Sequence, residues 1–327
     1  MSNLASSSTC FCTAGKDTPR TLADQRQLGP LVAVEGDLET LALLGTQLSD
    51  ALITTNNGAA LLTGKGGYGP SQNTSSPFRI SRNRINLRVC PCTNVQIFHA
   101  KDTAGSRSLV VATPDGSITH RIVTRSDYDE RVITALDDYE EGFSLPNQSS
   151  SKAASNVVSL SAVRTARENW DRNDTGHHLN DILFDGGATR MHTLPHIGRN
   201  KAWQIIPETL PSFISYLLDK RFGHARLVPG SGFIQGDLVR EGTASVVGSI
   251  LLTRSAEQHF ALDLDQVAAV WVTRIGPVSQ IEIYDVDRRT IAILAADPMT
   301  NLPDWNELLA SLPQMPKHFR SIQDAQR

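Results

Sequence analysis

The sequence predicts an α+β fold with an internal duplication: two halves, each a large antiparallel sheet with packed helices, and a ligand cleft between them. The first observation is a faint repeat, in which three pairs of segments agree in order and apolar phase: 85–89 with 260–264, 95–97 with 270–272, and 131–136 with 307–312. The second is that short turns join the strand-like runs, which indicates antiparallel pairing because parallel strands need long crossovers. Similar halves often bind ligands where they meet.

Length and composition agree with this organisation. The chain has 327 residues, 40% of them hydrophobic, enough for two cores. A net charge of −3 predicts no broad nucleic-acid surface. No apolar run reaches the ~18–20 residues of a membrane span, so we expect no membrane insertion. Segment 1–17 is polar and lacks the apolar core of a secretory signal, which favours a cytoplasmic protein.

The first half is expected to span 18–139. Leu38, Leu41, Leu44 and Leu48 have helical spacing, which predicts a helix over 37–53 with Asp37 as its N-cap. The glycine-rich run 64–69 lacks the closing residues of a phosphate-binding loop and is interpreted as a hairpin turn. The remaining elements expected here are β-type runs at 86–99 and 108–124, the second broken by a turn at 113–116, and a helix at 128–139.

A polar, serine-rich linker over 140–157 separates this half from a second one at 158–313. Helices are expected at 162–170, from 179 onward, at 209–218 and at 304–312. A glycine segment, 230–236, precedes strands at 246–253, 261–264, 268–273, 280–284 and 291–295. Segments 1–17 and 314–327 are interpreted as disordered tails.

Candidate chemistry gathers in the second half, where His177 and His178 open a helix after a polar turn. A neutral imidazole there could ligate zinc or haem iron. His192 and His196 have metal-binding spacing, but the proline between them disfavours a regular helix. A cleft that combined one histidine with Arg88 and Arg190 would suit an iron porphyrin, and a four-histidine metal site stays an alternative.

Three C-terminal motifs resemble one known family. They are Ala-Val-Trp-Val-Thr-Arg at 269–274, Val-Ser-Gln-Ile-Glu-Ile-Tyr-Asp at 278–285, and Pro-Asp-Trp-Asn-Glu-Leu-Leu at 303–309. They are similar to the bacterial hemin-degrading factor family, the HemS/ChuS-type haemin transport proteins, and segment 85–89 resembles its Leu-Asp-Leu-Arg-Leu motif. The resemblance identifies a divergent member that binds haem between its halves for haem uptake and iron acquisition.

The resemblance also implies roles for individual residues. The spacing from Trp170 to His177 matches the family's axial ligand, so His177 is expected to bind the haem iron, with His178 as the fallback. Arg190 corresponds to a propionate partner, and Arg88 to the distal arginine, the candidate catalytic residue. The chain departs from the family pattern at two positions: Ile275 replaces a propionate-binding lysine, and Cys90 replaces a distal aromatic residue.

The family pattern implies either a haem carrier or an oxygenase-type haem-degrading enzyme, and the sequence does not decide between them. Implied partners are haem, a haem ABC transporter on its cytoplasmic side or a downstream haem oxygenase, and a second copy in a homodimer. A second hypothesis is a duplicated scaffold that has lost haem and acts as a protein-interaction or regulatory module. The departures at Cys90 and Ile275 motivate it.

Overall fold

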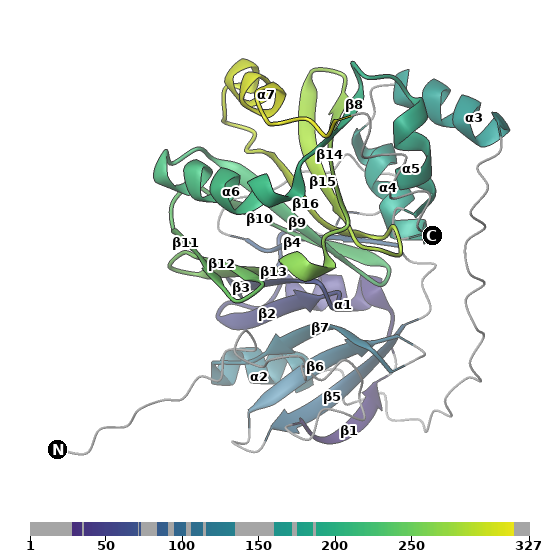
Figure 1. The fold of residues 1–327 in the computed structure, drawn as a ribbon. Helices are drawn as coiled ribbons and strands as arrows, with labels where there is room; N and C mark the ends of the chain where they lie inside the picture. Colours follow the sequence, from purple (N-terminus) through teal and green to yellow (C-terminus); the bar gives the residue numbers. More distant parts are fainter. Residues whose placement is uncertain are drawn as a thin grey trace.

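The computed structural model describes residues 28–34, 36–70, 72, 84–90, 95–102, 106–113, 116–134, 160–171, 175–185 and 188–316 (Figure 1). They form a nine-stranded and a seven-stranded sheet, and every strand pair is antiparallel. The predicted α+β class is therefore confirmed. Within these residues no helix is long and apolar enough to cross a membrane.

The elements follow the chain in two similar series. The first series is β1 (Leu28–Val34), α1 (Leu38–Gly45), β2 (Ala51–Asn56), β3 (Ala60–Gly66), β4 (Asn86–Val89), β5 (Gln96–Asp102), β6 (Arg107–Ala112), β7 (Ile118–Val123) and α2 (Asp127–Thr134). Three helices come next: α3 (Leu160–Asp171), α4 (Thr175–Asp185) and α5 (Ala188–Thr193), followed by the 3-10 turn η4 (Leu194–His196).

The second series is β8 (Ala202–Ile205), η5 (Pro207–Thr209), α6 (Leu210–Asp219), β9 (His224–Gly230), β10 (Phe233–Val239), β11 (Thr243–Val247), β12 (Ile250–Arg254), β13 (Gln258–Asp263), η6 (Leu264–Gln266), β14 (Ala269–Ile275), β15 (Val278–Tyr284), β16 (Thr290–Ala296) and α7 (Leu302–Ala310).

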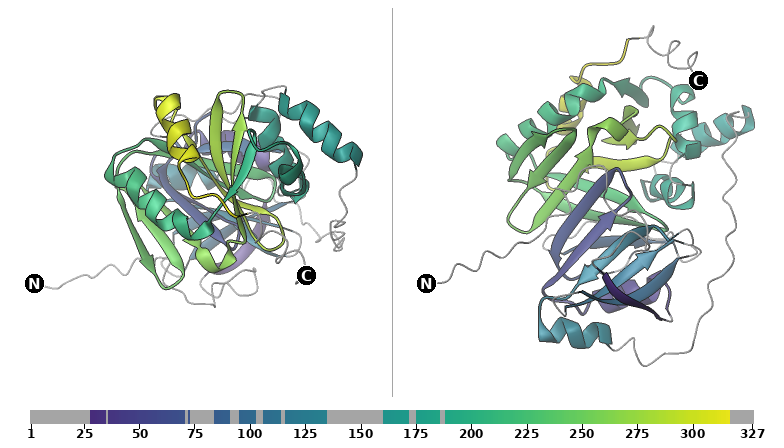
Figure 2. Two further views of the ribbon diagram at one scale, coloured as in Figure 1. Left: turned by 45° about the horizontal axis from the view of Figure 1, so that its top comes forward. Right: turned by 60° about the horizontal axis from the view of Figure 1, so that its bottom comes forward.

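The two sheets repeat one strand order and exchange one strand. The first runs β1-β5-β6-β7-β2-β3 and then takes β13 from the second half. The second runs β8-β14-β15-β16-β9-β10 and then takes β4 from the first half. The predicted duplication is thus present, and β4 and β13 occupy equivalent places. The right-hand view of Figure 2 shows first-half strands beside green strands of the second half.

The exchange joins the halves through main-chain hydrogen bonding. Leu62 in β3 lies opposite Phe260 in β13, and Arg88 in β4 lies opposite Ile234 in β10. Strands β12 and β11 extend the first sheet beyond the repeated order. The predicted linker 140–157 and tail 1–17 lie outside the described residues, so the domain boundaries stay predictions. Gln314, at the start of the predicted C-terminal tail, pairs with Ile205.

Two local predictions in the first half are wrong. The helix predicted over 37–53 ends at Gly45, and Ala51–Asn56 is strand β2, whose side chains alternate between buried and half-buried. The β-branched run in β2 fits that alternation better than a helix. The predicted N-cap is confirmed, since Asp37 Oδ1 accepts a hydrogen bond of 2.8 Å from the Thr40 amide. The predicted turn over 64–69 begins inside strand β3.

One strand predicted in the second half is a hairpin. Segment 246–253 contains the end of β11, a turn, and β12. Gly248 lies in this turn with φ of 61°, a left-handed conformation that glycine adopts without strain. The apolar pairs on either side of Gly248 concealed this break. The glycine segment 230–236 contains the turn between β9 and β10 and then continues as strand β10.

The packing at Gly45 gives a first testable prediction. A Cβ atom added there would lie 1.8 Å from Cδ2 of Tyr68, whose hydroxyl is hydrogen-bonded to buried His120. Because the ring cannot yield without breaking this contact, Gly45→Ala should lower the free energy of unfolding by about 1–3 kcal/mol. Urea denaturation measures this. Leu43→Ala, on the same helix and 67% exposed, is the control, and equal stability of both variants would contradict the packing.

Candidate functional site

Helices α3, α4 and α5 lie together beside the second sheet (Figure 1). Helix α4 is fixed there by Leu179, Ile182 and Leu183, whose helical spacing forms one apolar stripe. The stripe packs in one cluster with Cys90, Leu227, Ile234 and Ile293. The helix predicted from position 179 onward is therefore present, and its apolar stripe is buried against strands of the second half and against Cys90, which follows β4 of the first half.

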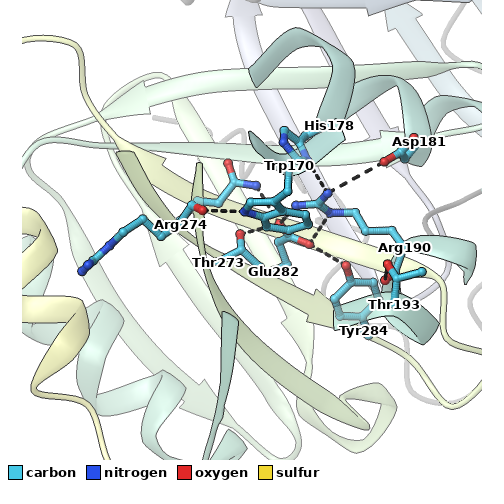
Figure 3. A network of polar contacts seen from close by, with 10 residues as sticks. Trp170, His178, Asp181, Arg190, Thr193, Thr273, Arg274, Glu282 and Tyr284 are labelled. Carbon is cyan, nitrogen blue, oxygen red and sulfur yellow. Dashed lines mark hydrogen bonds and ion pairs between the residues drawn. The ribbon is translucent and has the colours of Figure 1, made fainter. Parts of the chain in front are cut away.

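A buried carboxylate organises the polar contacts beneath these helices (Figure 3). Glu282, on β15, is fully buried. Arg190 donates to it through Nε to Oε2 at 2.8 Å and through Nη2 to Oε1 at 2.5 Å. Three further side chains also donate, Thr273 at 2.6 Å, Gln280 at 2.8 Å and Tyr284 at 2.5 Å. Five hydrogen bonds therefore satisfy a charge that the interior would otherwise exclude.

These contacts determine the charge state of the pair. Burial alone would raise the pKa of Glu282, but the charge of Arg190 and the donated hydrogen bonds lower this pKa to about 2. Burial also opposes the charge on Arg190, yet Glu282 raises the Arg190 pKa above its ordinary value. Both groups are consequently ionised across the neutral range, and the pair behaves as a permanent ion pair.

His178 is part of the same network. Its Nδ1 lies 2.6 Å from Arg190 Nη1, and because a guanidinium only donates, Nδ1 accepts and the neutral ring carries its proton on Nε2. The ring meets Trp170 edge-on, with centroids 4.5 Å apart, and Arg190 lies 4.4 Å above the Trp170 ring. Trp170 Nε1 donates to the Arg274 carbonyl at 2.6 Å. The contacts with Arg190 and Trp170 therefore hold the His178 ring in the protein interior.

Arg88 approaches the same helix from the other half of the chain. It is fully buried on β4, and its Nη2 donates to Asn180 Oδ1 of α4 at 2.7 Å. The strand exchange explains this contact, since β4 joins the second sheet at β10. The structure thus brings Arg88 and helix α4 together. The backbone of His177 lies in the first turn of α4, whereas its side chain lies outside what the structure describes.

The other sequence candidates do not join this group. His192 contacts Arg288, and the His196 carbonyl accepts from Arg167. Within the described part of the chain, no three His, Cys, Asp or Glu side chains lie close enough together to hold a metal ion. The four-histidine hypothesis therefore gains no support there. Ile275 is buried in an apolar cluster that contains Trp170.

Sequence reasoning missed Glu282 as the centre of this network. A usable signal was present, because Glu282 interrupts the strand Val278–Tyr284 next to isoleucines on either side. A strand buried on both faces accepts a carboxylate only beside a partner charge, which predicts a nearby arginine or lysine.

The fold and these contacts define a class: a duplicated α+β protein whose halves exchange a strand, with an arginine of one half meeting a helix of the other. No protein-family model matches the sequence, and no curated protein matches it. Solved structures do match. The apo and holo forms of PhuS, a heme-binding protein from Pseudomonas aeruginosa, each superpose with a TM-score of 0.70 at 19% identity over 87% of either chain.

ChuS, a heme degrading enzyme from Escherichia coli O157:H7, also superposes with a TM-score of 0.70. The identity is 15%, over 86% of this chain and 87% of that chain. At such identities the comparison establishes a common fold. It confirms the HemS/ChuS-type resemblance at the level of the fold and agrees with a divergent sequence.

Proposed function

We propose that this protein binds haem and acts in haem uptake for iron acquisition. The observation that carries the proposal is the contact between Arg88 and Asn180, which joins β4 of the first half to the helix that contains His177. It occurs in a fold shared over most of its length with PhuS, described as a heme-binding protein. A buried arginine beside a helix that begins with two histidines supplies two of the groups that haem proteins use.

On the iron side, the residue types present are those that haem would need. His177 would hold the iron through its imidazole, and Arg88 would supply a hydrogen-bond donor near it. On a helix, positions 177 and 180 share one face because they are three residues apart. Arg88 bonds to Asn180 on that face, whereas His178 already contacts Arg190 and Trp170, which favours His177 over His178 as the ligand. Bound haem would supply an iron centre able to exchange ligands and to react with oxygen.

The residues that the family resemblance assigns to the haem propionates match that role less well. Arg190, the candidate propionate partner, is buried against Glu282, and Ile275 offers no charge. This mismatch favours the second candidate function, a scaffold that has lost haem and binds a protein partner. We rank that candidate second because the Arg88–Asn180 contact keeps a buried cation beside the first turns of α4.

The carrier and enzyme roles make different demands on these residues. A carrier needs a releasable bond between iron and histidine, whereas an oxygenase also needs Arg88 to donate toward the distal side. We propose a cytoplasmic protein that receives haem from a transporter, and either hands it to a downstream oxygenase or degrades it. Incubation of the haem complex with reductant, with catalase present to remove free peroxide, separates the roles. Product or iron release indicates an enzyme, and intact haem indicates a carrier.

The proposal is tested by purifying the protein from haem-supplemented cells and measuring its haem and iron content. We expect about one haem per chain, since a single site is proposed between the two halves. Parallel incubation with iron-free protoporphyrin should give weaker retention, because the bond to His177 requires the metal. A protein that emerges free of haem and cannot be loaded would contradict the proposal.

The contact between the halves gives a second prediction. Asn180→Ala removes the hydrogen bond to Arg88 and should lower the free energy of unfolding by about 1.5–3 kcal/mol, as expected for a bond to a charged group. Urea denaturation measures the change. Asp181→Asn is the control on the same helix, because this half-exposed carboxylate lies 3.8 Å from Arg190 and contributes little. Equal effects of the two substitutions would count against a specific Asn180 contact.

A further inference from the structure

We infer that Arg190 does not recognise the carboxylates of haem but acts, together with Glu282, as a positioning residue that fixes helix α4 on the second sheet. The inference rests on the proposed haem function, because α4 contains His177. It implies that these two residues control the placement of the iron ligand, and that the site gains no specificity for the propionates from Arg190.

The first support is the set of contacts that Arg190 already makes. Its Nε and Nη2 bond to Glu282, and its Nη1 bonds to His178. The face of its guanidinium lies 4.4 Å from the Trp170 ring centroid, and its side chain is 1% exposed. The head group therefore faces protein on its edge and on its face, and a haem carboxylate would have to displace one of these contacts.

The second support is the cost of such a displacement. Glu282 is as buried as Arg190, and its other donors, Thr273, Gln280 and Tyr284, are all neutral. If Arg190 turned to a propionate, the Glu282 carboxylate would remain in the interior without a countercharge. Breaking one side of a buried pair is strongly unfavourable, because the abandoned charge stays desolvated.

The third support is the set of helices and strands that these contacts connect. Arg190 lies on α5, His178 and Asp181 on α4, Trp170 on α3, and Glu282 on β15. Figure 3 shows these side chains converging on the Glu282 carboxylate and the Arg190 head group. One ion pair thus connects three helices to the sheet. Ile275, at the other position expected to bind a propionate, is 2% exposed in an apolar cluster.

The test compares hemin with hemin dimethyl ester, which has the same iron and ring but no free carboxylates. Both are titrated in one detergent-containing buffer against wild type, Arg190→Lys, and the double variant Arg190→Met with Glu282→Gln, which leaves no unpaired charge and should fold. The Soret band of each complex reports the iron ligands. Thermal unfolding without haem reports the attachment of α4.

We expect the variants to unfold at lower temperature, and to bind hemin and its ester with an equal loss of affinity and an altered Soret band. Arg190→Lys should show the same losses of stability and affinity, because lysine cannot form the bidentate bond to Glu282. Selective loss of hemin over its ester, restored by lysine, would overturn the inference while leaving haem binding intact. A wild type that binds neither compound would overturn the proposed function, and the inference with it.

Discussion

Replacement of Glu282 by glutamine is expected to lower the free energy of unfolding by about 3–5 kcal/mol, since it leaves Arg190 charged and buried without its partner. Glutamine keeps the size of the side chain, so packing around Thr273 and Tyr284 changes little. Chemical denaturation at neutral pH measures the effect. Glu257→Gln, at an exposed position, is the matched control and should change stability by less than about 0.5 kcal/mol.

The same carboxylate should make stability depend on pH in a defined direction. The folded pKa of Glu282 is lowered from 4.5 to about 2, so its contribution is fully present above pH 4.5 and is lost as pH falls through about 2. The stability difference between wild type and Glu282→Gln should therefore shrink between these values. A difference that stays constant down to pH 2 would contradict an ionised Glu282 in the folded protein.

Removal of His177 is expected to give the largest effect on haem. Substitutions of the groups that merely orient a metal ligand already cost about 10–100-fold in metal affinity, and loss of the ligand itself should exceed that range. Capture of released haem by an excess of apomyoglobin measures the rate of haem loss. His177→Ala should therefore release haem more than about 100-fold faster than wild type.

His178→Ala is the control for this experiment. His178 is held by Arg190 and Trp170, so its removal should lower stability and disturb α4 while keeping a histidine-ligated spectrum. If His178→Ala releases haem as fast as His177→Ala and loses the histidine-ligated spectrum, or if His177→Ala retains haem, the assigned ligand is wrong.

The sequence predicted the repeat because apolar phase survives where identity does not. The matched pairs 85–89 with 260–264 and 95–97 with 270–272 fall on β4 with β13 and on β5 with β14. The exchange of β4 and β13 was not predictable, because strand pairing between distant segments leaves no local pattern. Helix α1 was extended too far, since Leu48 continues the leucine spacing past the point where β2 is about to begin.

The site was predicted less completely than the fold. Arg88 was singled out, and the structure brings it to α4, but its partner Asn180 had no distinguishing pattern. Arg190 was predicted to bind a haem propionate, whereas its contacts in the structure are with Glu282 and His178. Spacing along the chain reveals which residue types recur. It does not reveal that Arg190 pairs with Glu282, which lies 92 positions away and comes close only in the folded protein.

The most direct test of the proposed haem site is an optical titration of the wild-type protein with hemin. We expect a shifted Soret band that grows linearly and stops at one equivalent, because a single site is proposed between Arg88 and the helix of His177. A change proportional to added hemin with no saturation would contradict it. The fold would then have been kept without haem, and a protein partner would be the function to seek.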